Sequence, residues 1–352
     1  MDHISQATEK LEDFVCPAFT VTDGKILECN HAAAYIGLAP QQVVASLLDR
    51  PEDYGDFNGD CLYLPMTVGN TDFSAAIYKR EGFDLFLLDY ELEQQLLTFS
   101  LVSQKMRAPL ADLMLCAEQL LQKLPESDSA VSANMRRSMN QLHRMACNMS
   151  DAARYSSETT LHQSTIDIAA LINEVMERVC TIAEQNGIVV CYDKLNKPVD
   201  GLADAEKLER AVLNLMSNAM KVTPAGKTIR VSLRHSGNRL LFQVQDGGNG
   251  MQEDIRPTAF SQYQRKPSLF EYNRGLGLGM VIVRSAAAAH GGTLLLEHPK
   301  DEGLRITLSL AVRRNATPHL GSPLPVIDYA GGKDHALLEL SDVLPADAYQ
   351  TE

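Results

Sequence analysis

The sequence predicts an α+β protein with three folded parts: an α/β unit, a helical hairpin and an α/β sandwich. Three observations predict this order. Apolar and polar residues alternate over residues 1–90, two long segments of residues 91–160 have apolar residues at helical spacing, and strands alternate with helices over residues 161–313. Residues 314–352 follow as a tail of unknown role. A chain of 352 residues, 45% of them hydrophobic, can bury two or three separate cores.

The first part begins with a hairpin. Ala18–Thr22 and Lys25–Cys29 predict two strands joined by Asp23 and Gly24, residue types that tolerate the positive φ of a tight turn. A helix is predicted from Asn30 to Leu38, and three later strands are predicted over residues 61–66, 73–78 and 83–89. A hairpin, short helices and a three-strand return resemble a PAS-like sensor domain.

The hairpin of residues 91–160 consists of two predicted helices separated by the break at Leu124-Pro125-Glu126-Ser127-Asp128. Each helix has an apolar stripe, and a two-helix hairpin alone cannot bury both. Pairing with a second copy would give a dimeric four-helix bundle, so we expect a homodimer. Such stripes also occur as the ordinary core of helical proteins, and this alternative stays open.

The third part alternates strands and helices. A helix is predicted to open at Ile166, and mixed strands with helices on one face form an α/β sandwich. The other predicted elements are strands over 188–192, 229–233, 240–245, 292–296 and 304–310, and helices over 204–220 and 279–290.

One predicted helix carries two asparagines and a lysine. Asn214 and Asn218 are four residues apart and so project from one face, with Lys221 one turn further on. An amide oxygen can bind Mg²⁺ while the ion keeps waters and nucleotide phosphates as its other ligands. Taken alone, this spacing is more often a surface or capping feature.

A second motif follows a predicted strand and consists of Asp246, Gly248 and Gly250 in the run Asp-Gly-Gly-Asn-Gly. A carboxylate at a strand end can accept a hydrogen bond from the amino group of adenine. The glycines let the backbone pass close beneath a flat base. An isolated string of this kind is more often a turn.

The third motif, Gly275-Leu-Gly277-Leu278-Gly279, immediately precedes a predicted helix. Free backbone N–H groups and the positive end of the helix could bind phosphate there. A Rossmann dinucleotide fingerprint is excluded because no βαβ unit begins at this string.

Together and in order, the three motifs resemble the N, G1 and G2 boxes of the GHKL ATPase superfamily, and Phe260, Tyr263 and Arg265 resemble its F box. The resemblance covers residues 100–313 and points to a sensor histidine kinase homologue of two-component signal transduction. It implies ATP and Mg²⁺ as cofactors and a lid between Met251 and Arg274. It further implies these roles: Asn218 as Mg²⁺ ligand, Asn214 and Lys221 near the phosphates, Asp246 on adenine, Gly248 and Gly250 around its pocket, and Gly275, Gly277, Leu278 and Gly279 at the phosphate lid.

Two departures from the family concern phosphate acceptance. The segment from Val102 to Leu110 resembles the acceptor helix, but Gln104 replaces the acceptor histidine and Lys105 replaces the acidic residue after it. The lone pair of an amide nitrogen is delocalised, so Gln104 is no comparable nucleophile. We therefore expect a pseudokinase that regulates a partner kinase or a response regulator without phosphorylating itself at this position. Val222 also replaces a common aromatic residue, which would weaken nucleotide affinity.

Two alternatives remain. The chain could be an active histidine kinase with a displaced acceptor such as His143, the only histidine in the sequence of the hairpin. A histidine that packs in the hairpin or faces solvent is the simpler interpretation of His143. The chain could also be a non-kinase GHKL ATPase. Arg107, Pro109 and Leu110 of the acceptor-like helix argue against that reading.

Composition limits the partners and the compartment. The 45 acidic and 32 basic residues give a net charge of −13, which gives no support to nucleic-acid or anionic-membrane binding. Seven cysteines without a Cys-x-x-Cys pair predict neither a disulfide framework nor a zinc site. The sequence has no run of about 18 apolar residues and no signal-peptide pattern at its start. We therefore expect a cytoplasmic protein without a membrane span.

Overall fold

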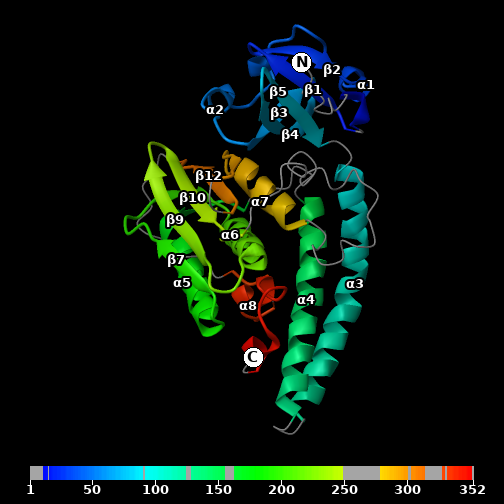
Figure 1. Ribbon diagram of the computed structural model, residues 1–352. Helices are drawn as coiled ribbons and strands as arrows, with labels where there is room; N and C mark the ends of the chain where they lie inside the picture. The colour runs from blue at the N-terminus through cyan, green and yellow to red at the C-terminus, as the bar shows by residue number, and fades with distance from the viewer. Residues whose placement is uncertain are drawn as a thin grey trace, which may run out of the picture. The chain divides into compact units, whose positions relative to one another are not determined.

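The structure is a computed structural model that describes residues 11–14, 16–89, 92–123, 128–154, 162–248, 278–299, 303–313, 327–329 and 331–350. The described residues form two compact units, one up to Leu92 and the other from Glu93 onward. Figure 1 shows the elements of both units.

The first unit is built on five antiparallel strands in the order β2-β1-β5-β4-β3. Asp23 (φ 52°) and Gly24 (φ 72°) form the two-residue turn of the β1–β2 hairpin, which confirms the prediction there. Its strands are β1 (Ala18–Thr22), β2 (Lys25–Cys29), β3 (Cys61–Val68), β4 (Thr71–Arg80) and β5 (Phe83–Asp89), and its helical turns are η1 (Leu11–Asp13), α1 (His31–Tyr35), η2 (Val44–Ser46) and α2 (Pro51–Gly55).

Asn30 fixes the chain at the start of this sheet. Its buried Oδ1 accepts hydrogen bonds from the backbone N–H groups of Ala18 at 3.0 Å and Ala33 at 2.9 Å, the second of which caps α1. Its Nδ2 donates to the carbonyls of Phe14 at 3.1 Å and Cys16 at 2.8 Å. One side chain therefore holds the segment before β1 against the beginning of α1.

The second unit begins with the helical hairpin of α3 (Leu92–Leu121) and α4 (Ser129–Arg154). Residues 124–127 of the predicted break lie outside the described residues, between the end of α3 and the start of α4. Ala117, Leu121 and Met139 form a small core between the two helices. Arg136 of α4 pairs with Glu118 of α3 at 3.0 Å. Large apolar side chains remain exposed on both helices, namely Leu101, Val102, Met106, Leu113, Leu115 and Leu120 of α3 and Val131, Met135, Leu142 and Met145 of α4.

The rest of the second unit is an α/β layer structure. Its strands follow the order β11-β12-β10-β9-β7, in which β7 is parallel to β9 and the other pairs are antiparallel. Helices α5, α6 and α7 pack against β7, β10 and β12, respectively. The elements are α5 (Ile168–Gln185), β7 (Val189–Asp193), α6 (Ala205–Val222), β9 (Thr228–Ser236), β10 (Arg239–Gln245), α7 (Leu278–Ala289), β11 (Leu294–Glu297) and β12 (Arg305–Ala311).

One predicted helix start was wrong. Ile166 lies in a short strand, β6 (Ser164–Asp167), which pairs with β8 (Asp200–Ala203). The helix α5 begins two residues later because the Asp167 carboxylate accepts from the backbone N–H groups of Ala169 and Ala170, each at 3.1 Å. Strands of four residues leave little periodicity for a sequence pattern to detect.

The tail beyond residue 326 is folded where it is described. It contains α8 (His335–Glu339) and the 3₁₀ turn η6 (Ala346–Tyr349). Helix α8 contacts α4, α5 and α6, and η6 contacts α4. Figure 1 shows α8 between α4 and the α5–α6 pair. The tail is therefore part of the second unit.

Candidate functional site

Helix α6 carries the first group of predicted site residues. Asp204 caps the helix by accepting from the backbone N–H of Lys207 at 3.2 Å, and an apolar face packs the helix into the unit. Along the helix Asn214 is buried, Asn218 is half-buried and Lys221 is exposed. The helix runs to Val222, two residues beyond its predicted end.

Asn214 lies at the contact between three helices. Its side chain is 0% exposed, and its Nδ2 donates to the carbonyl of Arg210 at 2.8 Å. Its Oδ1 accepts from Nη2 of Arg144, a residue of α4, at 3.4 Å. A Cβ added to Gly279 of α7 would stand only 2.7 Å from the same Oδ1. The fold thus brings together Asn214 of the first motif and Gly279 of the third.

Asp246 follows β10 and is held by backbone groups. Its Oδ1 accepts from the N–H groups of Gly248 at 2.9 Å and Leu304 at 3.1 Å. Burial raises the pKa of this carboxyl, although the two backbone hydrogen bonds oppose the shift. Both of these hydrogen bonds are to Oδ1, and within the described residues Oδ2 has no hydrogen-bond donor.

The second motif also touches the end of α6. A Cβ on Gly248 would lie 2.9 Å from Oδ1 of Asp246 and 3.0 Å from the carbonyl oxygen of Val222, so a larger residue would have to displace one of them. The N–H of Gly247 donates to Oγ1 of Thr223 at 3.1 Å, and that hydroxyl donates to the carbonyl of Ala219 at 2.7 Å. Thr223 was missed by sequence reasoning because its role depends on a contact with a distant loop.

Leu278 and Gly279 begin α7, with Leu278 buried. The N-terminus of α7 therefore lies next to Asn214, and unpaired N–H groups of a first helical turn favour anionic ligands. Gly250, Gly275, Gly277, the F-box residues Phe260, Tyr263 and Arg265, and the lid from Met251 to Arg274 lie outside the described residues.

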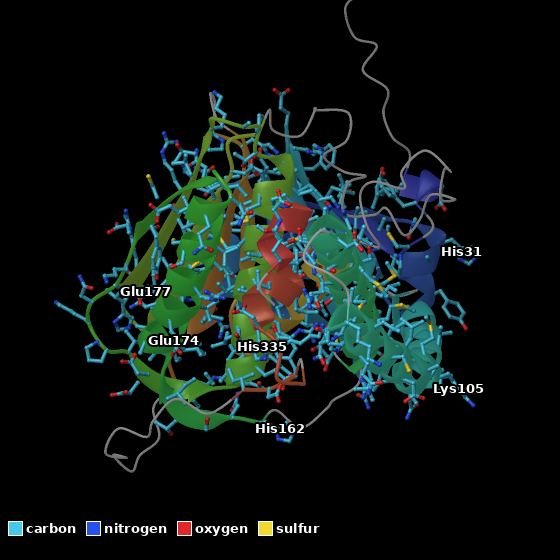
Figure 2. The ribbon with its side chains drawn as sticks, turned by 90° about the horizontal axis from the view of Figure 1, so that it is seen from below. His31, Lys105, His162, Glu174, Glu177 and His335 are labelled. Carbon is cyan, nitrogen blue, oxygen red and sulfur yellow. The ribbon has the colours of Figure 1, made fainter. Side chains whose placement is uncertain are left out.

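Gln104 and Lys105 lie on α3, away from the residues above in the sequence. Both side chains are exposed, and Figure 2 shows Lys105 pointing outward from the hairpin. The neighbouring Arg107 donates to Oγ of Ser150 on α4 at 2.9 Å. The exposed amide of Gln104 therefore stands where the sequence resemblance places a phosphate acceptor.

Arg144 and His290 were also missed. Arg144 reaches Asn214 from another helix, and His290 accepts a hydrogen bond from the backbone N–H of Asp204 at 2.9 Å. No local sequence pattern predicts either contact, because the partners are 70 and 86 residues apart in the sequence.

Part of the chain, including Asn214, Asp246 and Gly279, resembles a known protein family. Residues 203–314, which include α6, β10 and α7, match the family described as histidine kinase-, DNA gyrase B-, and HSP90-like ATPase. The chain contains a histidine kinase-type ATPase domain. The ATPase domain thus holds all of the described motif residues from Asn214 to Gly279.

Relatives of the chain include several sensor kinases. The chain is 27% identical over 236 residues to hybrid signal transduction histidine kinase D of Dictyostelium discoideum, a match covering 63% of this chain and 15% of the relative. It is 24% identical over 225 residues to the adaptive-response sensory kinase SasA of Microcystis aeruginosa, covering 61% and 58%. The matched regions therefore span less than two thirds of these relatives.

Among solved structures, full-length ShkA in complex with AMPPNP is similar to this chain, with 27% identity and a TM-score of 0.49. That match covers 64% of this chain and 47% of ShkA. Within the described part of the chain, no helix has both the length and the apolar character needed to span a membrane.

Proposed function

We propose that the chain is a nucleotide-binding regulator of two-component signalling that does not accept phosphate at position 104. The observation that carries this proposal is Gln104, an exposed amide on α3 in a chain with a histidine kinase-type ATPase domain. Transfer to histidine needs a ring nitrogen with an available lone pair, which an amide lacks. Lys105 adds a positive charge where an acid would assist.

The described residues fit Mg·ATP as ligand. Asn218 is half-buried and offers an amide oxygen, a hard donor suited to Mg²⁺ that keeps phosphates and waters as its other ligands. Asp246 would accept from the adenine amino group, and the N-terminus of α7 would receive the phosphates. Lys221, exposed at the end of α6, would add positive charge near them. Bound Mg²⁺ would neutralise phosphate charge at this site.

As a pseudokinase, the chain would act through its partners. ATP binding would change how the ATPase domain packs on the hairpin, and a response regulator or a partner kinase would respond to the hairpin surface. Ligand binding shifts such an equilibrium only through different affinities for the two arrangements. The antiparallel sheet of the first unit supports a PAS-like sensor role for residues 1–90.

A homodimer is the arrangement that we propose for the hairpin. The exposed apolar residues of α3 and α4 form stripes at helical spacing, which water-exposed helices of a monomer rarely keep. A second copy would cover both stripes in a four-helix bundle.

A second candidate function is an active kinase that uses His143 as the acceptor. Among the described residues, its buried Nδ1 has no hydrogen-bond partner. Burial lowers the pKa of His143, and the positive charge of Lys333 adds to this shift, which favours the neutral, nucleophilic ring. The half-buried position of His143 would require an opening of α4 before a phosphate could reach it.

The decisive experiment incubates the full chain with Mg²⁺ and γ-labelled ATP, beside a calorimetric titration of ATP binding. We expect binding without labelling of the natural chain, and labelling of a Gln104→His, Lys105→Glu variant. The control is Gln119→His, the same substitution at another exposed position of α3. Labelling of the natural chain that disappears in His143→Gln would establish the second candidate instead. Absence of ATP binding would overturn both.

A further inference from the structure

The C-terminal segment, described over residues 327–329 and 331–350, lies beyond the ATPase domain but is firmly packed on it. The matched domain ends at residue 314, whereas Leu338, Leu340, Leu344 and Tyr349 of the segment are all fully buried. The hydroxyl of Tyr349 donates to the carbonyl of Leu337 at 2.8 Å and closes the segment on itself. Apolar burial of this kind indicates a specific docked position.

On one side, the segment binds the hairpin helix α4. Arg137 and Gln141 both donate to the carbonyl of Ser341, at 3.2 and 3.0 Å. Lys333 donates to Oδ1 of Asn140 at 2.8 Å. Polar groups at successive turns of α4 therefore recognise the backbone and side chains of the segment.

On the other side, the segment binds helices of the ATPase region. His335 contacts Glu209 of α6 at 3.0 Å, and Arg178 of α5 donates to Asp334 at 2.7 Å. Figure 2 shows His335 on α8, between the ATPase helices and the hairpin. The segment thus ties α4 to α5 and α6.

Glu339 of the C-terminal segment forms ion pairs with both sides. Its side chain is 0% exposed; Oε2 pairs with Nε of Arg144 from α4 at 3.0 Å, and Oε1 pairs with Nε of Arg210 from α6 at 3.3 Å. Asp342 adds a second carboxylate to Arg144 at 2.7 Å. A buried charge is costly unless it is paired, and the C-terminal segment supplies the carboxylates that pair with both arginines.

Arg144 connects these ion pairs of the C-terminal segment to the proposed nucleotide site. Arg144 is oriented by Glu339 and Asp342, and its Nη2 reaches Oδ1 of Asn214. Since Nδ2 of Asn214 is bound to the carbonyl of Arg210, both polar atoms of the side chain are already engaged. In this arrangement Asn214 is fully buried and both polar atoms of its side chain bond to protein groups, which keeps the side chain away from a nucleotide.

We propose that residues 327–350 form a C-terminal clasp that holds α6 against α4 and withdraws Asn214 from the nucleotide. The clasp is an autoinhibitory contact and rests on the proposed nucleotide site. Opening it releases Arg144, exposes Asn214 and strengthens binding of Mg·ATP. Because coupling between sites is reciprocal, bound nucleotide in turn opens the clasp.

The test compares Mg·ATP affinities of full-length variants by calorimetry. Arg144→Gln removes the contact to Asn214 while Glu339 keeps Arg210 as partner. Arg137→Ala with Gln141→Ala loosens the clasp at Ser341 without touching Arg144. We expect each to raise affinity roughly tenfold, the size of a typical coupling between sites. Arg136→Gln is the matched control, because this arginine of α4 pairs with Glu118 of α3 and leaves affinity unchanged.

The results of these titrations distinguish the clasp from the nucleotide site. Unchanged or weakened binding in both clasp variants overturns the clasp while the nucleotide site stands, and weakened binding in Arg144→Gln would mean that the guanidinium binds phosphate. No binding in any variant overturns the nucleotide site and the clasp with it. Hydrogen exchange of the natural chain gives a second measurement: Mg·ATP should speed exchange at the amides of Leu338 and Leu340, and equal protection with and without nucleotide contradicts the coupling.

Discussion

Nε2 of His290 accepts a hydrogen bond from the backbone N–H of Asp204 at 2.9 Å, which joins the end of α7 to the start of α6. Nδ1 of the same ring lies 2.7 Å from the carbonyl of Ala286. One nitrogen must therefore donate and the other accept, so the ring is neutral. The imidazole of His290 thus connects the start of α6, the helix of Asn214, to the end of α7, the helix of Gly279.

The first prediction follows from this ring. Burial lowers the pKa of His290, so the folded chain excludes a proton that the unfolded chain binds below about pH 6.5. The contribution of His290 to the free energy of unfolding is therefore complete above about pH 6.5 and falls as the pH drops. His290→Ala should cost about 1–3 kcal/mol at pH 7.5, because the N–H of Asp204 loses its acceptor. Denaturant titrations of both proteins at pH 7.5 and 5.5 measure the free energy of unfolding that His290→Ala removes at each pH. A smaller loss at pH 7.5 than at pH 5.5 would contradict this prediction.

A second prediction concerns the C-terminal clasp and has the opposite pH dependence. Burial lowers the pKa of His335, but the hydrogen bond and charge of Glu209, with Asp328 and Asp334, outweigh it and raise the pKa overall. The contribution of His335 is complete below about pH 6.5 and is lost as the pH rises through its raised value. Stability measured from pH 6 to 9 should fall less steeply in His335→Gln than in the natural chain. His162→Gln, which makes the same substitution at an exposed histidine, is the control.

A third prediction tests the contact between Gly279 and Asn214. Alanine usually stabilises a helix relative to glycine by about 1 kcal/mol. At Gly279 the added methyl would press on Oδ1 of Asn214, so Gly279→Ala should lower the free energy of unfolding by about 1–3 kcal/mol. In a double-mutant cycle with Asn214→Ala the penalty should vanish, since no oxygen remains to be displaced. Simple additivity would show that the two residues do not meet.

A fourth prediction addresses the stripes of the hairpin. Leu113→Glu with Leu120→Glu should convert a dimer into a monomer, because two buried leucines contribute roughly 3 kcal/mol or more to association, about a hundredfold in dissociation constant. Light scattering after size exclusion measures the mass. Leu27→Glu, at an exposed leucine of β2, is the control and should leave the mass unchanged. A natural chain that is already monomeric at micromolar concentration would refute the homodimer.

Sequence patterns predicted the elements whose signals are local. The Asp23-Gly24 turn depends on two adjacent residues, and the pattern of α6 depends on residues three or four apart. Both elements were predicted close to their observed bounds. The strand pair β6–β8 was missed because four residues give no clear period. For the candidate site, spacing identified Asn214 and Gly279, but their contact depends on how α6 and α7 pack.

The contacts that could not be predicted are those between remote segments. Glu339 and Arg144 are 195 residues apart, and neither lies in a recognisable motif. A buried glutamate in an apolar run looks like a solvent-facing residue of an amphipathic helix until its partners are placed beside it. Only the tertiary structure distinguishes the two.

The burial of Tyr349 has a practical consequence for work on fragments. A recombinant piece ended at residue 314, where the family resemblance stops, would lack the side chains that cover α4 and α6. The newly exposed apolar surface would favour aggregation, and Arg144 and Arg210 would lose their ion pairs with Glu339 and Asp342. A fragment that keeps the packing of the second unit therefore has to include the buried side chain of Tyr349.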